Sequence, residues 1–201
     1  MKTVTGLFDD YEDATDAVGE LEAIGVPNSD ISLVASNSSG WYDEDKSSEA
    51  AEGAAGGAGI GAFVGGAGGL LTGLGLMAIP GVGPVVAAGW LAATAVGALG
   101  GAAVGGAAGG IVGALTSSGV SEDDAHAYAE GVRRGGTLVT ARVADDLAAE
   151  AEEILDSATS VDLEERRTAY RKGGWTAFDP DAENYTADET AKDRTRTANR
   201  L

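Results

Sequence analysis

Apolar and polar positions alternate or recur at helical spacing through the first 35 residues. Residues 2–8 alternate imperfectly, which predicts a β-strand. Apolar side chains then recur every three or four residues, which predicts a helix with the buried face Tyr11, Ala14, Val18, Leu21 and Ile24. Gly25 suits the end of that helix, and Pro27 prevents its continuation. A second strand is expected over residues 31–35, so this region predicts a β-α-β unit.

A helix followed by a strand is predicted after residue 121. Ser121 and Asp124 have the spacing of a helix cap, and Gly135 with Gly136 suits the other end. The expected buried face of this helix consists of Ala125, Tyr128, Ala129 and Val132. Residues 137–143 then alternate, which is typical of a strand.

The pattern continues with shorter elements. Asp145 is expected to cap a helix that reaches Leu155. A short strand over residues 160–163 and a charged helix over residues 164–172 follow. The order of elements therefore predicts an α+β fold, a ferredoxin-like split β-α-β domain interrupted by an inserted segment. We expect its sheet to have four antiparallel strands with the helices on one face.

The inserted segment has a different composition from the rest of the chain. No residue from Gly53 to Ser121 is charged, and 23 of the 32 glycines lie there. Glycine recurs every fourth residue in two series, namely Gly57, Gly61, Gly65, Gly69 and Gly73, then Gly97, Gly101, Gly105, Gly109 and Gly113. Between the series stands a turn signal made of Pro80, Gly81, Gly83 and Pro84. The two series mirror each other about this turn, which predicts an antiparallel glycine-zipper helical hairpin.

These patterns divide the chain into four predicted parts. The parts are a discontinuous α/β domain (residues 1–36 and 121–172), an acidic linker (37–52), the uncharged glycine-zipper helical hairpin (53–120) and a disordered acidic tail (173–201).

The predicted hairpin suits two environments, a lipid bilayer and a soluble assembly. A helix over residues 54–79 would be about 39 Å long, enough to cross a bilayer. Its large apolar side chains cluster near the turn, which favours insertion at the tip rather than along the whole length. The alternative is a soluble assembly in which the zippers of several copies pack together. Deleting residues 53–120 would then abolish oligomers and leave a folded monomer.

Charge narrows the range of partners. The chain has 13 Lys and Arg against 32 Asp and Glu, a net charge of -19. This excess argues against nucleic-acid binding, so we expect no nucleic-acid partner. Any membrane contact must be apolar, because anionic headgroups repel such a surface. The acidic, Lys-poor composition also suggests a halophilic source as a hypothesis.

The chemistry of the side chains indicates no reaction. There is no cysteine, and the single histidine, His126, is expected on a solvated helix surface. The glycine-rich stretches lack the neighbouring lysine of a phosphate loop. Clustered acids suit a solvated surface. Arg133–Arg134 suit an ordinary helix C-terminus, a contact with an acid of the neighbouring helix or a contact with an anionic headgroup. We therefore expect a protein that is not an enzyme, without cofactor or metal.

Four stretches resemble a known family. They are Val4-Thr5-Gly6-Leu7-Phe8-Asp9-Asp10, Asp30-Ile31-Ser32-Leu33-Val34, Ala78-Ile79-Pro80-Gly81-Val82-Gly83-Pro84 and Tyr128-Ala129-Glu130-Gly131-Val132-Arg133-Arg134-Gly135-Gly136-Thr137-Leu138-Val139. Together they are similar to the bacterial general stress proteins, labelled heat-induced or low-temperature-induced, over about residues 2–178. The resemblance implies an expression response and no catalytic residues. The tail after Phe178 departs from the family pattern.

Three functional hypotheses follow. The first is a stress-response protein associated with membrane lipid through the hairpin and self-associating, at the cytoplasmic face of the cell membrane, because the N-terminus lacks a signal-peptide pattern. The second is a soluble cytoplasmic assembly protein that uses the zippers for self-association. The third, by analogy with other ferredoxin-like sheets, is a small-ligand regulatory module.

Overall fold

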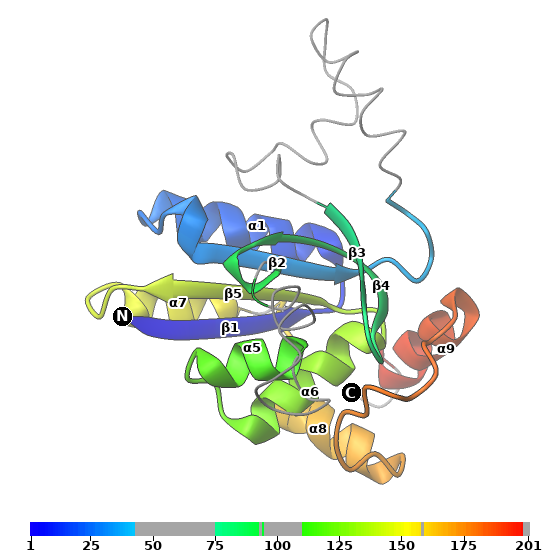
Figure 1. Cartoon of the computed structure of the whole chain (residues 1–201). Coiled ribbons are helices and arrows are strands. Elements are labelled where there is room, and N and C mark those ends of the chain that lie inside the picture. Colours follow the sequence, from blue (N-terminus) through cyan, green and yellow to red (C-terminus); the bar gives the residue numbers. More distant parts are fainter. Residues whose placement is uncertain (43–74, 93, 95–109, 158, 199–201) are drawn as a thin grey trace, which may run out of the picture.

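The described chain forms one antiparallel sheet covered by helices. The structure is a computed structural model, and it describes residues 1–42, 75–92, 94, 110–157 and 159–198 (Figure 1). The strands are β1 (Lys2–Phe8), β2 (Ile31–Ser36), β3 (Gly75–Ile79), β4 (Gly83–Gly89) and β5 (Thr137–Val143). The helices are α1 (Tyr11–Ala23), the 3-10 helix η1 (Asn28–Asp30), α5 (Ile111–Ser117), α6 (Glu122–Arg133), α7 (Ala148–Leu155), α8 (Leu163–Lys172) and α9 (Ala187–Ala198). The prediction of a mixed α+β fold is confirmed.

The sheet has the strand order β1-β5-β2-β4-β3. β5 lies between β1 and β2 and pairs antiparallel with both, with Thr140 opposite Thr5 on one side and Ser32 on the other. β4 extends the sheet beyond β2, and β3 is its last strand. Segments far apart in the sequence thus share one sheet, so neither half of the chain forms the sheet alone.

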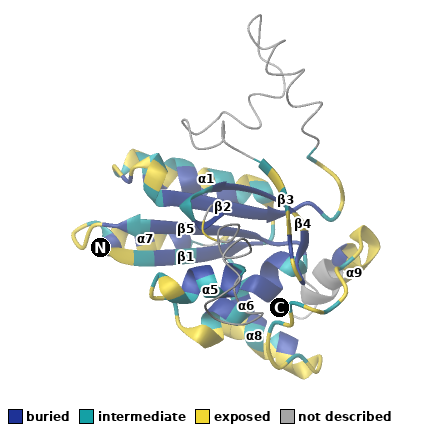
Figure 2. Cartoon of the chain, viewed as in Figure 1, coloured by how far each residue is buried: buried dark blue, intermediate teal, exposed yellow. Residues whose placement is uncertain are grey.

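Two hydrophobic cores lie on opposite faces of the sheet (Figure 2). α1 and α7 cover the first face, where Phe8, Leu21 and Leu33 are completely buried. α5 and α6 cover the second face, where Leu115 and Leu138 are completely buried. The alternation predicted for residues 137–143 explains this division, because odd and even positions of β5 enter different cores. The prediction of helices on one face is wrong.

Local sequence signals fix several element boundaries. Ser121 caps α6, since its hydroxyl oxygen accepts a hydrogen bond from the Asp124 backbone N–H at 3.2 Å. The predicted strands over residues 2–8 and 137–143 have the observed bounds. The helix expected from Asp145 begins later, at Ala148, and Leu147 occupies the cap position. Asp145 instead forms an ion pair with the N-terminal amine.

The predicted helical hairpin is wrong at its tip. Residues 75–79 and 83–89 are the strands β3 and β4, and the turn between them is a β-turn closed by the Val82 N–H donating to the Ile79 carbonyl. Pro80 and Gly81 take the two central positions of this turn, where Gly81 has a φ of 72°. A Pro-Gly pair suits this turn as well as a break between helices, and the valines of β4 favour a strand. The register brings Gly75 opposite Ala87, so no glycine faces a glycine here.

Two further predictions differ from the structure. The expected strand over residues 160–163 is reduced to a single bridge between Phe8 and Ser160. The sheet accordingly has five strands rather than four, and two of them come from the segment expected to be helical. The tail expected to be disordered contains α9, and its Thr190 is buried.

Candidate functional site

The predicted zipper residues fall largely outside the described residues. These are Gly57, Gly61, Gly65, Gly69, Gly73, Gly97, Gly101, Gly105 and Gly109. Gly113 lies in α5, which packs in the second core. The predicted turn residues Pro80, Gly81, Gly83 and Pro84 form the β3–β4 connection and the start of β4. The structure therefore places this turn, and it leaves the packing of the two glycine series as a prediction.

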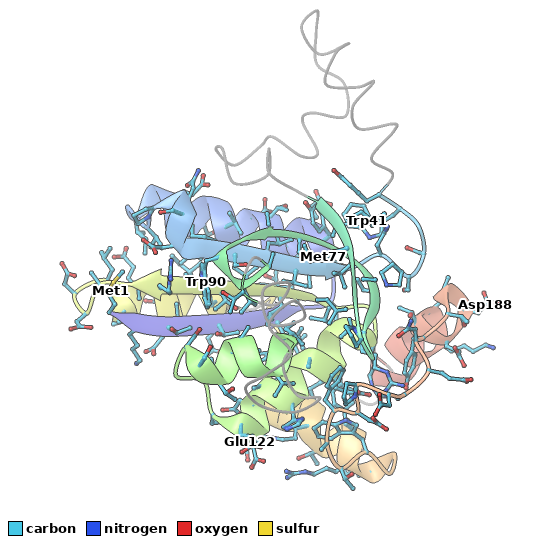
Figure 3. The ribbon with its side chains drawn as sticks, in the orientation of Figure 1. Met1, Trp41, Met77, Trp90, Glu122 and Asp188 are labelled. Carbon is cyan, nitrogen blue, oxygen red and sulfur yellow. The ribbon has the colours of Figure 1, made fainter. Side chains whose placement is uncertain are left out.

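Two tryptophans, one before and one after the β3–β4 hairpin in the sequence, hold the chain against the domain. The Trp41 indole N–H donates to the Ser36 carbonyl at 2.9 Å, and its ring lies 4.7 Å from that of Tyr11. Figure 3 shows Trp41 at the end of β2. The Trp90 indole N–H donates to the Asp30 carbonyl at 3.1 Å. Trp41 thus packs against α1 through Tyr11, and Trp90 is hydrogen-bonded to η1 through Asp30.

Arg142 contacts both Trp90 and Asp30. Its guanidinium lies 4.8 Å from the centre of the Trp90 ring and donates a hydrogen bond to the Asp30 carboxylate at 2.8 Å. A cation over an indole ring is stabilised by the electrons of the ring face. Gly110, directly before α5, lies against Ile79 of β3. Trp90 and Gly110 are thus both held close to the sheet.

The C-terminal tail packs against the turn of the β3–β4 hairpin. We call residues 178–190 the tail clamp. A Cβ atom on Gly81 would lie 2.5 Å from the Cα of Pro180, and one on Gly83 would lie 3.2 Å from Asn184. Figure 3 shows Asp188 of α9 on the same side of the molecule as this turn. The tail clamp therefore sits against the hairpin backbone with no room for a side chain at Gly81.

A buried carboxylate lies beneath the tail clamp. Glu130 of α6 has no exposed surface, and its carboxylate accepts hydrogen bonds from Arg133 at 3.2 Å and Arg134 at 2.6 Å. Both arginines are largely buried as well. A buried carboxylate needs such partners, because removing a charge from water costs several kcal/mol. Arg133 lies in the last turn of α6 and Arg134 directly after it, as expected for a helix C-terminus, and their acid partner lies on the same helix rather than on a neighbouring one.

The same arginines hold the tail clamp. Arg133 donates to the Glu183 carbonyl at 2.8 Å, and its guanidinium lies 4.8 Å from the centre of the Tyr185 ring. Arg134 lies 4.3 Å from the ring centre of Tyr170 in α8. Burial raises the pKa of Tyr170 to about 12. One ion cluster on α6 therefore joins the tail clamp and α8 to the domain.

His126 makes another contact with the tail clamp. Its Nδ1 atom accepts a hydrogen bond from the Phe178 backbone N–H at 3.2 Å, and its side chain is only 21% exposed. Phe178 packs against the second core. The expected solvated surface for His126 is therefore wrong, because the tail covers it.

Sequence reasoning missed Glu130 and the tail contacts. Glu130 stands three and four residues before Arg133 and Arg134, which is the spacing of ion pairs on one helix face. This spacing could have predicted the ion cluster. Nothing in the tail sequence marks Tyr185 or Phe178 as packed, since both stand among polar residues.

The described residues contain neither a membrane-spanning helix nor a cluster of metal ligands. Among those residues, no helix has the length and apolarity needed to cross a bilayer. No group of three or more acidic or histidine side chains there is arranged to hold a metal ion. Comparisons of the chain with protein-family models, curated proteins and solved structures gave no match. The resemblance to general stress proteins stays a prediction.

Proposed function

We propose that the protein is a non-enzymatic association protein, in which the acidic α+β domain presents two uncharged glycine-rich arms for self-association. The first arm comprises residues 53–74 and the second arm residues 95–109. The resemblance to general stress proteins adds the expectation that the chain is made in response to stress.

The observation that carries this proposal is that the chain between the two arms belongs to the domain. β3 and β4 lie in the sheet, and Val85 and Leu91 are buried in the second core. Contacts of Trp41 precede the first arm, and contacts of Trp90 and α5 lie on either side of the second. We therefore propose two separate arms in place of one continuous hairpin.

The buried hairpin changes which residues are left for association. Val85, Val86 and Leu91, expected at a membrane-inserting tip, are buried in the domain. The arms retain mostly glycine and alanine. Their larger apolar side chains are six in the first arm (Ile60, Phe63, Val64, Leu70, Leu71 and Leu74) and three in the second (Val96, Leu99 and Val104). Small residues at four-residue spacing favour close packing of backbones more than they favour transfer into lipid. Self-association is therefore the first proposal.

Membrane contact through the first arm is the second proposal. This arm has 22 consecutive uncharged residues, about 33 Å if helical, which matches the hydrocarbon thickness of a bilayer. The acidic domain would stay on the cytoplasmic side, repelled by anionic headgroups. If this contact is absent, the protein is a cytoplasmic assembly protein. A small-ligand regulatory role is the third alternative, by analogy only.

A test of association through the arms must leave β3, β4 and α5 intact. Deleting residues 53–120 would remove parts of the sheet and core, so that deletion cannot test association. We suggest a zipper variant with Gly61→Leu, Gly65→Leu, Gly101→Leu and Gly105→Leu in the full chain. A matched control carries Gly59→Leu, Gly66→Leu, Gly100→Leu and Gly106→Leu, outside the four-residue series.

The two proposals predict different results for these variants. Self-association through the zippers is lost in the zipper variant and kept in the control, measured as molar mass by light scattering. Membrane contact persists or strengthens in both variants, since both gain apolar surface, measured by flotation with neutral phosphatidylcholine vesicles. A monomeric wild-type chain that does not float contradicts both proposals.

A further inference from the structure

We propose that the outer edge of β1 is a docking site for an extended, basic peptide segment of another protein. This site is separate from the glycine-rich arms. β1 is an outermost strand of the described sheet, beside β5 (Figure 1). A groove of about 720 Å³ runs along it, lined by residues of β1 from Thr3 to Leu7. At the spacing of a strand, the five lining residues from Thr3 to Leu7 span about 17 Å.

The ladder geometry shows which backbone groups of β1 face the groove. The Leu7 carbonyl accepts from the Val161 N–H at 2.8 Å, and the Thr5 carbonyl accepts from the Tyr128 hydroxyl at 3.0 Å. Both partners lie away from β5, so Thr3, Thr5 and Leu7 direct their backbone groups outward. Among the described residues, none accepts a hydrogen bond from the N–H groups of these three positions.

One end of this edge already pairs with a short extended segment. Ser160 forms an antiparallel bridge with Phe8, and Val161 donates to Leu7. The remaining edge, at Thr3 and Thr5, has N–H donors two residues apart, which is the spacing that a paired strand requires, whereas Leu7 is buried and already paired with Val161. An incoming segment would continue the pairing that Ser160 begins. Addition of a strand to a sheet edge is a common mode of peptide recognition.

The walls of the groove carry negative charge. Its lining acids come from two helices and the turn after α7, and they are Asp124, Glu152, Glu153 and Asp156. Only Glu152 is paired with a lysine, Lys2, among the contacts of the described residues. Asp124 pairs with Arg167. Glu153 and Asp156 are left as two exposed carboxylates beside the edge.

The acidic groove could receive a second copy of this chain or a basic segment of another protein, and its charge favours the basic segment. A second copy of the chain, pairing β1 with β1, would bring the same acids face to face and be repelled. A segment that alternates basic and apolar residues would instead place its cations against Glu153 and Asp156. Charge complementarity of this kind sets the register and the choice of partner. The edge therefore fits a basic extended segment and disfavours self-pairing.

The test uses the full chain and a labelled peptide, acetyl-Lys-Val-Lys-Val-Lys-Val-amide, measured by fluorescence anisotropy. We expect binding, and slower amide hydrogen exchange at Thr3 and Thr5 when the peptide is present. The groove variant Glu153→Gln/Asp156→Asn should bind about five-fold more weakly, from the loss of two exposed charge pairs. The control Glu12→Gln/Asp16→Asn makes the same change of net charge on α1, away from the groove, and should bind almost as well as the wild type.

Three results would overturn the proposal. The first is equal loss of binding in the groove and control variants, which would mean attraction to net charge alone. The second is equal binding of the Glu-Val peptide of the same pattern. The third is unchanged hydrogen exchange at Thr3 and Thr5 with bound peptide. Because both variants change only exposed acids, their circular dichroism and thermal unfolding should match those of the wild type.

Discussion

The Nε atom of Arg134 lies 2.6 Å from Oε1 of Glu130, a carboxylate that has no exposed surface. Arg134 also covers the ring of Tyr170, at 4.3 Å. One arginine therefore satisfies a buried charge on its own helix and packs against α8. This contact lies under the tail clamp and joins three parts of the chain that are distant in sequence.

Replacing Glu130 with Gln should strongly destabilise the protein. The substitution keeps the shape but leaves Arg133 and Arg134 without their shared carboxylate, and losing one partner of a buried ion cluster costs about 3 kcal/mol. Urea unfolding followed by circular dichroism measures the change. Glu20→Gln on the exposed face of α1 is the control and should change stability little. Equal stability of the Glu130 variant would contradict the structural role of the cluster.

Gly81→Ala should separate the tail clamp from the hairpin turn. Its φ of 72° disfavours alanine, and the added Cβ would also clash with Pro180. Gly25→Ala is a matched control, because Gly25 has a φ of 99° and open space around its Cβ position. We expect the control to lose about 1 kcal/mol from backbone strain alone, and Gly81→Ala to lose more. Thermal unfolding of both variants measures the difference.

Removing the tail should abolish that difference. In a chain ending at Trp175, the backbone atoms of Asp179 and Pro180 are absent, so Gly81→Ala should cost no more than Gly25→Ala in the same truncated chain. The truncated chain itself should be less stable than the full chain, because Arg133 loses Glu183 and Tyr185. An unchanged penalty for Gly81→Ala after truncation would show that the tail does not pack on the turn.

Stability should fall at alkaline pH. Burial raises the pKa of Tyr11 and of Tyr170 from 10.0 to about 12, and it raises the pKa of Tyr128 further. Between pH 10 and the pKa values of the folded state, the unfolded chain has lost phenolic protons that the folded chain keeps. The free energy of unfolding therefore decreases as pH rises. The stabilisation from the buried phenols is complete below pH 10 and is lost as the pH rises through the pKa values of the folded state. Urea unfolding on either side of pH 10 measures this slope.

A tyrosine variant tests the source of the alkaline slope. Tyr170→Phe should make the slope shallower, since one buried phenol no longer titrates. Tyr185→Phe is the control, because Tyr185 forms its ring contacts in the tail clamp rather than in the core. Equal slopes in the wild type and the Tyr170 variant would exclude Tyr170 as a source.

The sequence predicted those elements whose local signals agree with their packing. The alternation over residues 137–143 and the Ser121 cap each indicate one kind of element, so β5 and α6 were predicted with nearly correct bounds.

The β3–β4 hairpin was missed because residues 75–79 are too few to show a period, and the glycine spacing around them suggested a helix. The hairpin joins the sheet through pairing of β4 with β2, while β3 pairs with β4. The contact between β4 and β2 joins segments about fifty residues apart, so it is not visible locally.

The candidate site was predicted only in part for a similar reason. Pro80 and Gly81 were correctly assigned to a turn, because their backbone preferences act locally. The tail clamp depends on contacts between residues about fifty or more positions apart, such as Arg133 with Glu183. Polar tail residues carry no pattern that reveals such a contact. The same holds for the burial of Glu130, which depends on packing of three separate segments.

Self-association through the glycine series is tested by the molar mass of the full chain in solution, measured by sedimentation over a range of concentrations. We expect an oligomer for the wild type and for the control with leucine at Gly59, Gly66, Gly100 and Gly106. We expect a folded monomer for the variant with leucine at Gly61, Gly65, Gly101 and Gly105. A wild-type monomer at every concentration, or equal loss of mass in both variants, would contradict it.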